Sequence, residues 1–180
     1  MDTYSLIAQA FGIAAMVFSI LSFQQKSRAG VITFQMICGL LFCVNFFMLG
    51  AYVGSLLNAI AFVRAIIFLN KEKLHADNMP WLIGFILVFI GCYVLSFTLF
   101  GKEPTVKNFI LEVLPVIGMT ASTISFRYSD AKSIRKYGLI SSPAWLVYNI
   151  ASGSLGAIVC ESLNLGSIFI GMLRYDRKKQ

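Results

Sequence analysis

Long apolar stretches alternate with short polar or basic segments along nearly the whole chain. A helix that crosses a bilayer needs about 20 predominantly apolar residues, and seven stretches come close to that length. They cover residues 4–23, 31–49, 52–70, 80–100, 106–126, 136–152 and 155–173. Little of the chain is left for a soluble domain, so the pattern predicts an all-α membrane protein with seven transmembrane helices.

The order of these features is repeated within the chain. Ser22-Phe23 opens a loop of basic and hydroxyl residues, followed by an apolar helix, a glycine-containing turn and another apolar helix. Ser125-Phe126 opens the same series 103 residues later. Matching pairs are Gln9 and Glu112, Ser19 and Ser122, Asn45 and Asn149, Gly50 and Gly153, and Asn58 and Glu161. A duplicated three-helix unit in an apolar chain is typical of transporters that bind solute between their halves.

The stretch at 80–100 has no counterpart and separates the two halves. A single intervening span makes both halves enter the membrane in the same direction, so the repeats are parallel and related by an axis along the membrane normal. We therefore expect a first three-helix repeat in residues 1–73 and a linker with the fourth transmembrane helix in 74–105. Residues 106–180 form the second three-helix repeat and a basic tail. This is a 3+1+3 arrangement.

Composition supports a membrane protein and excludes a soluble domain of this length. Hydrophobic residues make up 58% of the chain and charged residues 13%, and the mean hydropathy is +0.78. A soluble globular domain carries about twice that charged fraction. The chain starts with Asp2 close to its N-terminus and has no basic segment before the first apolar stretch. It therefore lacks the pattern of a secretory signal, and we expect the first helix to be retained.

The net charge of +7 would suggest nucleic acid binding in a soluble protein, but its distribution indicates membrane topology instead. If the N-terminus lies outside, twelve Lys and Arg residues fall inside and two fall outside. The inside set is Lys26, Arg28, Lys71, Lys73, Arg127, Lys132, Arg135, Lys136, Arg174, Arg177, Lys178 and Lys179; the outside set is Lys102 and Lys107. This bias predicts an outside N-terminus and a cytoplasmic C-terminus. No nucleic acid partner is expected.

The sequence contains no arrangement of reactive side chains that is typical of an enzyme active site. The four cysteines lie inside apolar stretches without a CxxC spacing, so we interpret them as small hydrophobic residues and expect no metal or cofactor. His75 lies in a charged loop, where it is either simply solvated or a pH sensor. No phosphate-binding loop, nucleophile elbow or zinc motif occurs. All aspartates lie outside the apolar stretches, which argues against intramembrane hydrolysis.

Glycine and proline occupy matching places within the helices of the two halves. Gly12 falls opposite Pro115, and Gly39 falls opposite Pro143. Both residue types weaken the hydrogen-bond ladder of a helix, so these positions are candidate hinges for a rocking motion of the halves. The alternative is that glycine and proline are simply frequent in transmembrane helices.

The layout and one loop motif suggest a family. The 3+1+3 order and the loop Lys26-Ser27-Arg28-Ala29-Gly30 resemble the SWEET and PQ-loop superfamily, although Phe23-Gln24-Gln25 stands where a Pro-Gln dipeptide is expected. The stretch 22–30, with the overall length and tail, is most similar to the bacterial inner-membrane YgjV-type family. The resemblance implies a SWEET-like fold in the bacterial inner membrane. In SWEET-like transporters two asparagines on the third and seventh helices face the solute; Asn58, and either Glu161 or Asn164, match them by position.

Polar groups within the bilayer are the candidate site, because a charge there costs about 2.5–3.5 kcal/mol by insertion scales. Asn164 follows Glu161 by one helical turn and shares its face, and Asn58 occupies the matching place in the first half. One interpretation is a pocket for a small polar solute, with Glu161 as hydrogen-bond acceptor or proton-coupling group. The other is a polar clamp between the halves, although such bonds average only about 0.6 kcal/mol in membranes.

The remaining polar positions leave alternatives open. Asn45 and Asn149 either contribute to the solute site or cap carbonyl groups at the glycine turns, and Trp145 either stacks on a ring-shaped solute or fills the bundle. Gln9 and Glu112 are a gate, a proton site or a hydrated rim. Arg64 either snorkels toward the cytoplasm or forms an inner gate or anion contact.

Taken together, these features predict a transporter of a small polar metabolite, passive or proton-linked, that works by alternating access in the lipid bilayer. The alternative is a receptor or assembly protein that uses the same fold without transport. Seven helices can enclose a pathway alone, so an oligomer is allowed but not required.

Overall fold

The computed structural model describes residues 3–48, 52–151 and 155–176. The predicted turns at Gly50 and Gly153 lie outside these ranges. Within them the ordered elements are eight α-helices and one short π-helix, with no strand. The prediction of an all-α protein is confirmed, whereas the arrangement of seven spans stays a prediction.

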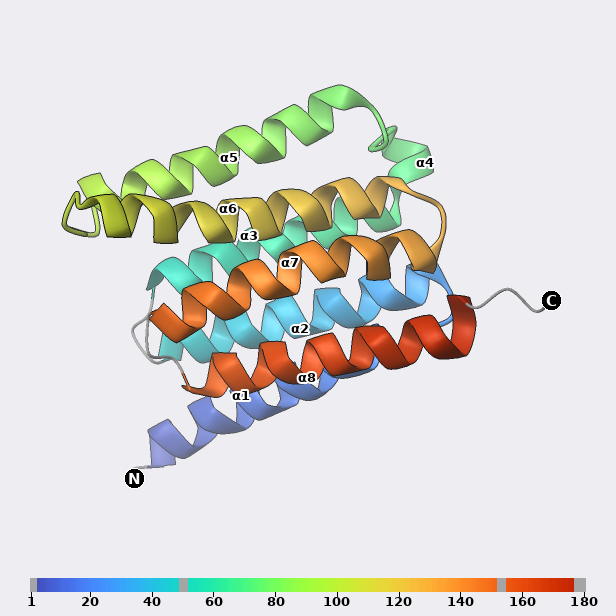
Figure 1. The fold of residues 1–180 in the computed structure, drawn as a ribbon, viewed down its shortest axis with the longest axis horizontal. Coiled ribbons are helices and arrows are strands. Elements are labelled where there is room, and N and C mark those ends of the chain that lie inside the picture. The colour runs from blue at the N-terminus through green and yellow to red at the C-terminus, as the bar shows by residue number, and fades with distance from the viewer. Residues whose placement is uncertain (1–2, 49–51, 152–154, 177–180) are drawn as a thin grey trace.

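The helices lie side by side and alternate in direction (Figure 1). Their bounds are α1 (Thr3–Ser22), α2 (Arg28–Met48), α3 (Tyr52–Leu69), α4 (Lys71–Leu74), α5 (Met79–Thr98), α6 (Val106–Arg127), α7 (Ala131–Ala151) and α8 (Leu155–Gly171), followed by the π-helix η1 (Met172–Asp176). The short helix α4 and the π-helix were not predicted.

Helices α2 and α7 begin earlier than their apolar stretches, because each start carries a polar cap. The Ser27 hydroxyl accepts a hydrogen bond from the Gly30 N–H at 3.0 Å. The Asp130 carboxylate accepts one from the Ser133 N–H at 2.7 Å. Such caps satisfy the first amide groups of a helix, and hydropathy alone does not register them.

The helices form two groups of three with the same internal order. Helix α2 packs between α1 and α3, and α7 packs between α6 and α8. The groups meet where α1 contacts α8, α2 contacts α7 and α3 contacts α6. If α1, α2 and α3 are matched to α6, α7 and α8, the α1–α8 contact corresponds to the α3–α6 contact. The α2–α7 contact then corresponds to itself, as expected for two groups related by a two-fold axis. The centre of the molecule is therefore an interface between the groups.

Helix α5 is attached mainly to α6 and reaches the first group through aromatic side chains. Phe85 of α5 lies 6.0 Å from the ring of Phe68 on α3. Phe68 in turn lies 5.9 Å from Phe126 on α6, and Phe89 stacks on Phe85 at 6.1 Å. Large rings in tilted or stacked contact dominate the energy of such a core, so this cluster fixes α5 against both groups.

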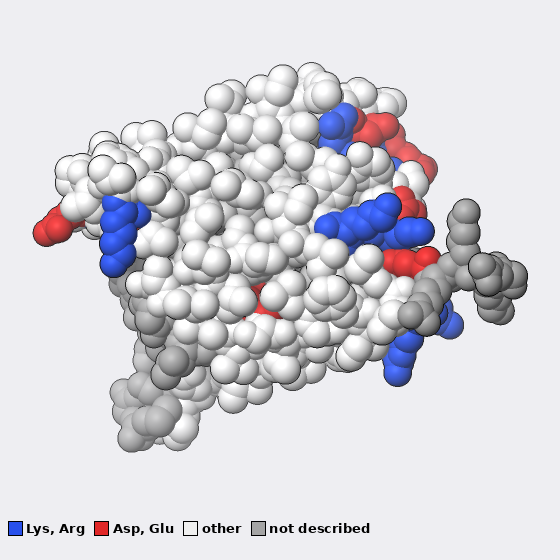
Figure 2. Space-filling view, in the orientation of Figure 1, with Lys and Arg blue, Asp and Glu red and all other residues white. Residues whose placement is uncertain are grey.

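Charged side chains gather at the two ends of the helices, with an almost uncharged band between them (Figure 2). One end, here called the basic end, carries Lys26, Arg28, Lys71, Lys73, Arg127, Lys132, Arg135, Lys136 and Arg174, whereas Lys102 and Lys107 lie at the opposite end. Among the described residues, α2, α5 and α6 are long and apolar enough to cross a membrane by themselves. Many large apolar side chains of the band are exposed, including Ile83, Leu87 and Ile90 on α5, which suits contact with lipid.

Candidate functional site

A cavity of about 230 Å³ lies between the two groups of helices. All six helices of the groups contribute to its wall, whereas α5 does not. Its polar lining is Ser19, Gln35, Asn58, Arg64, Ser122, Ser141, Ser142, Asn149, Glu161 and Asn164. A cavity at the interface of two repeats, lined by apolar residues and a few polar groups, is the common form of a small-molecule site.

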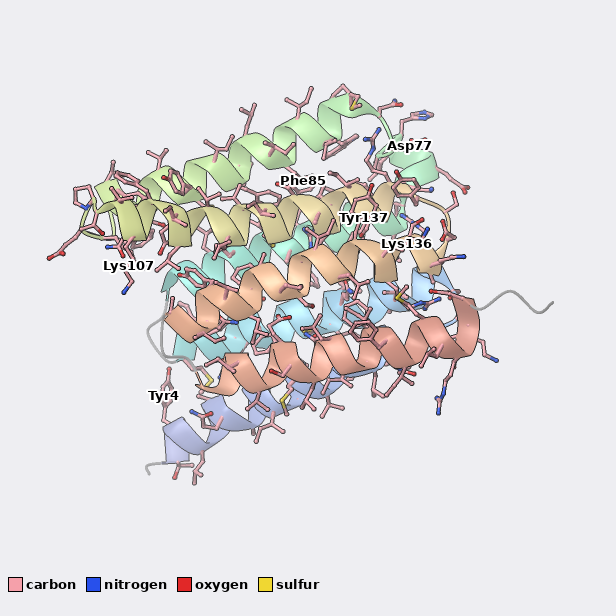
Figure 3. All side chains as sticks on the ribbon, in the orientation of Figure 1. Tyr4, Asp77, Phe85, Lys107, Lys136 and Tyr137 are labelled. Atoms are coloured by element: carbon pink, nitrogen blue, oxygen red, sulfur yellow. The ribbon has the colours of Figure 1, made fainter. Side chains whose placement is uncertain are left out.

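The structure brings together most of the residues that the sequence singled out. Those that line the cavity are Asn58, Arg64, Trp145, Asn149, Glu161 and Asn164, with the candidate hinge Gly39. They come from α2 and α3 in one group and from α7 and α8 in the other. Figure 3 draws the described side chains on the ribbon of these helices. Asn58 and Glu161, the matched pair of the repeat, therefore face one cavity from different groups.

Glu161 is held by neutral neighbours. The Asn164 amide donates a hydrogen bond to its Oε2 at 3.4 Å, and the Ser142 hydroxyl of α7 is a second hydrogen-bonding neighbour. The carbonyl oxygen of Asn164 accepts a hydrogen bond from Ser19 of α1 at 2.9 Å. Asn164 thus bridges the two groups, as the clamp alternative expects, while it also orients the carboxyl group at the cavity wall.

Arg64 is a buried cation without an anionic partner among the described residues. It is only 5% exposed, so the snorkelling alternative is wrong. Its Nη1 donates to the Met119 carbonyl at 2.9 Å and to the Thr123 hydroxyl at 3.0 Å, both on α6. The guanidinium carbon lies 5.0 Å from the centre of the Phe126 ring. Its Nε is buried and has no hydrogen-bond partner.

Trp145 lies against α6 as well as the cavity. A Cβ on Gly118 would come within 2.7 Å of the indole Nε1, so the ring fits there because residue 118 has no side chain. The ring also meets Tyr148 edge-on at 5.9 Å. Trp145 therefore fills the bundle and lines the cavity at the same time.

Asn45 and Asn149 have different surroundings although they match in the repeat. Asn149 lines the cavity. The Asn45 amide instead donates to the Ala8 carbonyl of α1 at 2.7 Å and is 5% exposed. It packs against Gly12, where an added Cβ would lie 3.1 Å from its amide nitrogen. Asn45 is not among the cavity residues, and its contact with the α1 backbone differs from both a solute contact and a turn cap.

Two of the three gate candidates, Gln9 and Glu112, are not among the residues that line the cavity. Gln9 is exposed on α1. Glu112 is buried, forms an ion pair with Lys102 and accepts a hydrogen bond from Ser96 of α5 at 3.4 Å. Glu112 therefore ties α5 to α6 in this structure, and a role as a gate stays a prediction.

The candidate hinges do not interrupt their helices. Helix α6 continues through Pro115 and α7 through Pro143. Gly39 of α2 faces α3, where an added Cβ would lie 3.5 Å from the Asn58 carbonyl oxygen, an ordinary packing distance. Whether these positions bend stays a prediction.

Hydroxyl groups extend the cavity toward the basic end. A second cavity of about 30 Å³ shares Gln35, Ser122, Ser141 and Ser142 with the first and reaches Ser125. The sequence interpretation missed these residues, together with Cys38 and Cys160 on the main cavity wall. The adjacent serines Ser141 and Ser142 in the predicted stretch 136–152 were the available signal.

Two arginines link the two groups of helices at the basic end. Arg28 donates to the carbonyl groups of Phe126 at 2.5 Å and Phe68 at 2.7 Å. Arg135 donates to the Gln25 carbonyl at 3.0 Å and pairs with Asp176 of the π-helix at 2.5 Å. Each arginine bridges the two groups, and this cross-linked basic end of the bundle is called the floor below.

Comparison with known proteins supplies the family. The sequence model of the family Imp-YgjV, described as a bacterial inner membrane protein, matches residues 6–179. This chain belongs to that family. It is 24% identical over 181 residues to the inner membrane protein YgjV of Escherichia coli (strain K12). The alignment covers 97% of this chain and 87% of that relative. No solved structure matches it significantly. The chain is therefore an integral protein of the bacterial inner membrane, and the expected YgjV-type family is confirmed.

Proposed function

We propose that this protein transports a small polar solute across the inner membrane by alternating access. The observation that carries the proposal is the polar cavity between the two groups of helices, with a cross-linked floor at one end. Polar and charged groups inside an apolar protein lower its stability. Binding of a solute would explain why this protein has them.

The proposal includes the seven-span 3+1+3 arrangement of parallel repeats, of the SWEET-like kind. Helices α1 to α3 and α6 to α8 are the repeats, and α5 is the linker span. The two-fold exchange of contacts between the groups supports this assignment. In each repeat the first and third helices run toward the basic end and the middle helix runs away from it (Figure 1). The two repeats therefore have the same direction, as parallel repeats do.

In the proposed topology the basic end faces the cytoplasm and the N-terminus lies outside. The support is the concentration of Lys and Arg at the end where α1, α3, α6 and α8 finish (Figure 2), since positive charge is retained on the cytoplasmic side. The floor made by Arg28 and Arg135 is then the inner closure, and release of solute to the cytoplasm requires these bonds to open.

Accessibility of the cavity from each side tests the proposal without knowledge of the solute. Cys38, Cys43, Cys92 and Cys160 are first replaced by serine or alanine. Ser142→Cys then places one thiol where both cavities meet, and Ile150→Cys, exposed on the outer face of α7, is the matched control. Inverted and right-side-out vesicles are treated with a membrane-impermeant thiol reagent.

We expect the cysteine at position 142 to react from both sides, at different rates, and Arg135→Ala to raise the cytoplasmic rate. The control cysteine should not respond to that substitution. A thiol that reacts from one side only, in both backgrounds, would contradict alternating access and favour the receptor or assembly alternative.

A further inference from the structure

Among the described residues, two side chains that carry charge line the cavity, and they are of opposite sign. Arg64 comes from α3 in the first group and Glu161 from α8 in the second. Among the described residues, neither takes part in an ion pair. Each is held in place by neutral groups on the protein, so neither charge is neutralised by the other.

The Arg64 guanidinium is the less satisfied of the two. One of its nitrogens donates to Met119 and Thr123, but its buried Nε has no partner. A buried cation without a counter-charge costs several kcal/mol, and a planar guanidinium matches a carboxylate with paired hydrogen bonds. An anionic group, a carboxylate first of all, is the chemical complement of this position.

Glu161 has acceptor capacity left over. A carboxylate offers about four acceptor positions, and its neighbours here are a long hydrogen bond from Asn164 and the Ser142 hydroxyl. A primary ammonium group, with three donors, complements the remainder. Asn58 faces the same cavity and matches Glu161 in the repeat.

The spacing suits a small molecule. Arg64 follows Asn58 by six residues, roughly 9 Å along α3 at 1.5 Å per residue, and its guanidinium is held by Met119 and Thr123 of α6. Arg64 and Glu161 line the same cavity from different groups, so a solute that contacts both needs two opposite charges within one small molecule. The cavity volume of about 230 Å³ is below the usual range of roughly 300–1,000 Å³ for drug-sized ligands.

Other classes of solute satisfy one charge and not the other. A simple anion would leave Glu161 facing a like charge, and a simple cation would leave Arg64 uncompensated. A neutral sugar would neutralise neither. We infer that the cavity binds a small zwitterion of the α-amino acid class, with its carboxylate at Arg64 and its ammonium group at Glu161. This inference rests on the proposed transport function and adds the substrate class.

Binding to the full chain in lipid nanodiscs tests the inference. The probes are neutral L-α-amino acids, each measured beside its decarboxylated amine and its 2-hydroxy acid, with glucose as an uncharged probe. At least one amino acid should bind 10-fold or more tightly than both of its analogues. A factor of ten corresponds to about 1.4 kcal/mol.

Two variants assign the ends of the solute. Arg64→Gln should bring the affinity for the amino acid down to that for its amine, and Glu161→Gln should bring it down to that for its 2-hydroxy acid. Arg174→Gln and Ser162→Ala, both exposed and absent from the cavity wall, are the matched controls and should bind as wild type does. The wild-type panel alone decides the matter if a variant does not fold.

The inference would be overturned if every amino acid that binds is matched in affinity by one of its analogues, or if no amino acid binds. Binding of glucose or of a 2-hydroxy acid alone would overturn it while supporting a solute site. The accessibility of Ser142→Cys decides alternating access independently of any solute, so failure of the substrate class and failure of the transport proposal are separate results.

Discussion

The two three-helix groups keep the same contacts but carry different polar groups. Arg64 of α3 donates to α6, at Met119 and Thr123. Ser167, at the matching position of α8, donates to the Ile20 carbonyl of α1 at 2.5 Å. Each thus bridges to the first helix of the other group. The two groups therefore have a bridging side chain at the same position, but it is a charged arginine in the first group and a neutral serine in the second.

Some local devices are the same in both groups. The Ser22 hydroxyl donates to the Ser19 carbonyl at 2.7 Å, and the Ser125 hydroxyl donates to the Ser122 carbonyl at the same distance. The cavity and the floor differ: Glu161 stands opposite Asn58, and the buried Arg135 stands where the first group has Val31. The difference teaches that the helix contacts define the duplicated scaffold and that solute recognition, as proposed, comes from the unmatched charges.

Among the residues that differ between the two groups, Arg135 at the floor should cause the largest loss of stability when it is replaced. Arg135 and Asp176 have side chains that are 2% and 6% exposed. Arg135→Ala leaves the buried Asp176 carboxylate uncompensated, which should lower the free energy of unfolding by about 3–5 kcal/mol. Thermal or denaturant unfolding of the detergent-purified protein measures the loss. The double variant Arg135→Ala/Asp176→Ala should recover part of it, and a double variant as unstable as the single one would refute the pairing.

The next largest effect is expected at Gly171, where α8 crosses close to the Phe23 backbone at the basic end. A Cβ on Gly171 would collide with the Phe23 carbonyl oxygen, a backbone atom, and lie 3.0 Å from the Arg135 side chain. Gly171→Ala should therefore destabilise by about 1–3 kcal/mol, as overpacking does. Gly166→Ala in the same helix meets nothing within 4 Å and is the control. Equal melting temperatures for the two variants would contradict the close crossing of α8 and the Phe23 backbone.

The two helix caps allow a comparison by pH. Burial alone would raise the pKa of the Asp130 carboxyl, but hydrogen bonds from Ser133 and the charge of Lys136 outweigh it, and the pKa is lowered. The stabilisation is therefore complete above the ordinary value near 4 and is lost as the pH falls through the lowered value. Asp130→Ala and Ser27→Ala should each cost about 1 kcal/mol at neutral pH. The cost of Asp130→Ala should shrink in acid, while that of Ser27→Ala should not change. Unfolding curves at several pH values measure both.

The matched asparagines should give the smallest and most selective effects. Asn45→Ala removes the bond to the Ala8 carbonyl and should cost about 0.6–1.7 kcal/mol, the range for interhelical hydrogen bonds in membranes. Asn149→Ala should change stability less and alter solute binding instead, because Asn149 lines the cavity. Unfolding and nanodisc binding of both variants check this. Loss of binding with Asn45→Ala at unchanged stability would reverse the assignment.

The sequence predicted the helices well because long apolar stretches and their interruptions are local signals. The predicted stretch 52–70 corresponds to α3, and 106–126 corresponds to α6. It did less well where polar residues belong to a helix. Helix α2 begins at Arg28, and α7 already includes Arg135 as its fifth residue. Hydropathy assigned both arginines to loops, although the caps Ser27 and Asp130 mark both starts.

The site was predictable where matched polar residues stand alone in apolar helices, as Asn58 and Glu161 do. It was not predictable where the direction of a side chain decides. Asn45 and Asn149 match in the repeat, yet one contacts the backbone of α1 and the other lines the cavity. Arg64 lies near enough to the basic end to snorkel, but the Met119 carbonyl and the Thr123 hydroxyl of a distant segment hold it inside. Such partners become neighbours only in the folded chain.

The polar character of α7 has a consequence for biogenesis. Although α7 has 21 residues, it is not among the described helices that are apolar enough to cross a membrane alone, and it lies between α6 and α8. A nascent segment of this kind gains little from lipid and much from a neighbouring protein surface. Helix α6, which is apolar enough by itself and is synthesised just before, offers that surface. Integration of α7 is therefore expected to wait for α6, so that the order of translation is also the order in which the cavity wall is assembled.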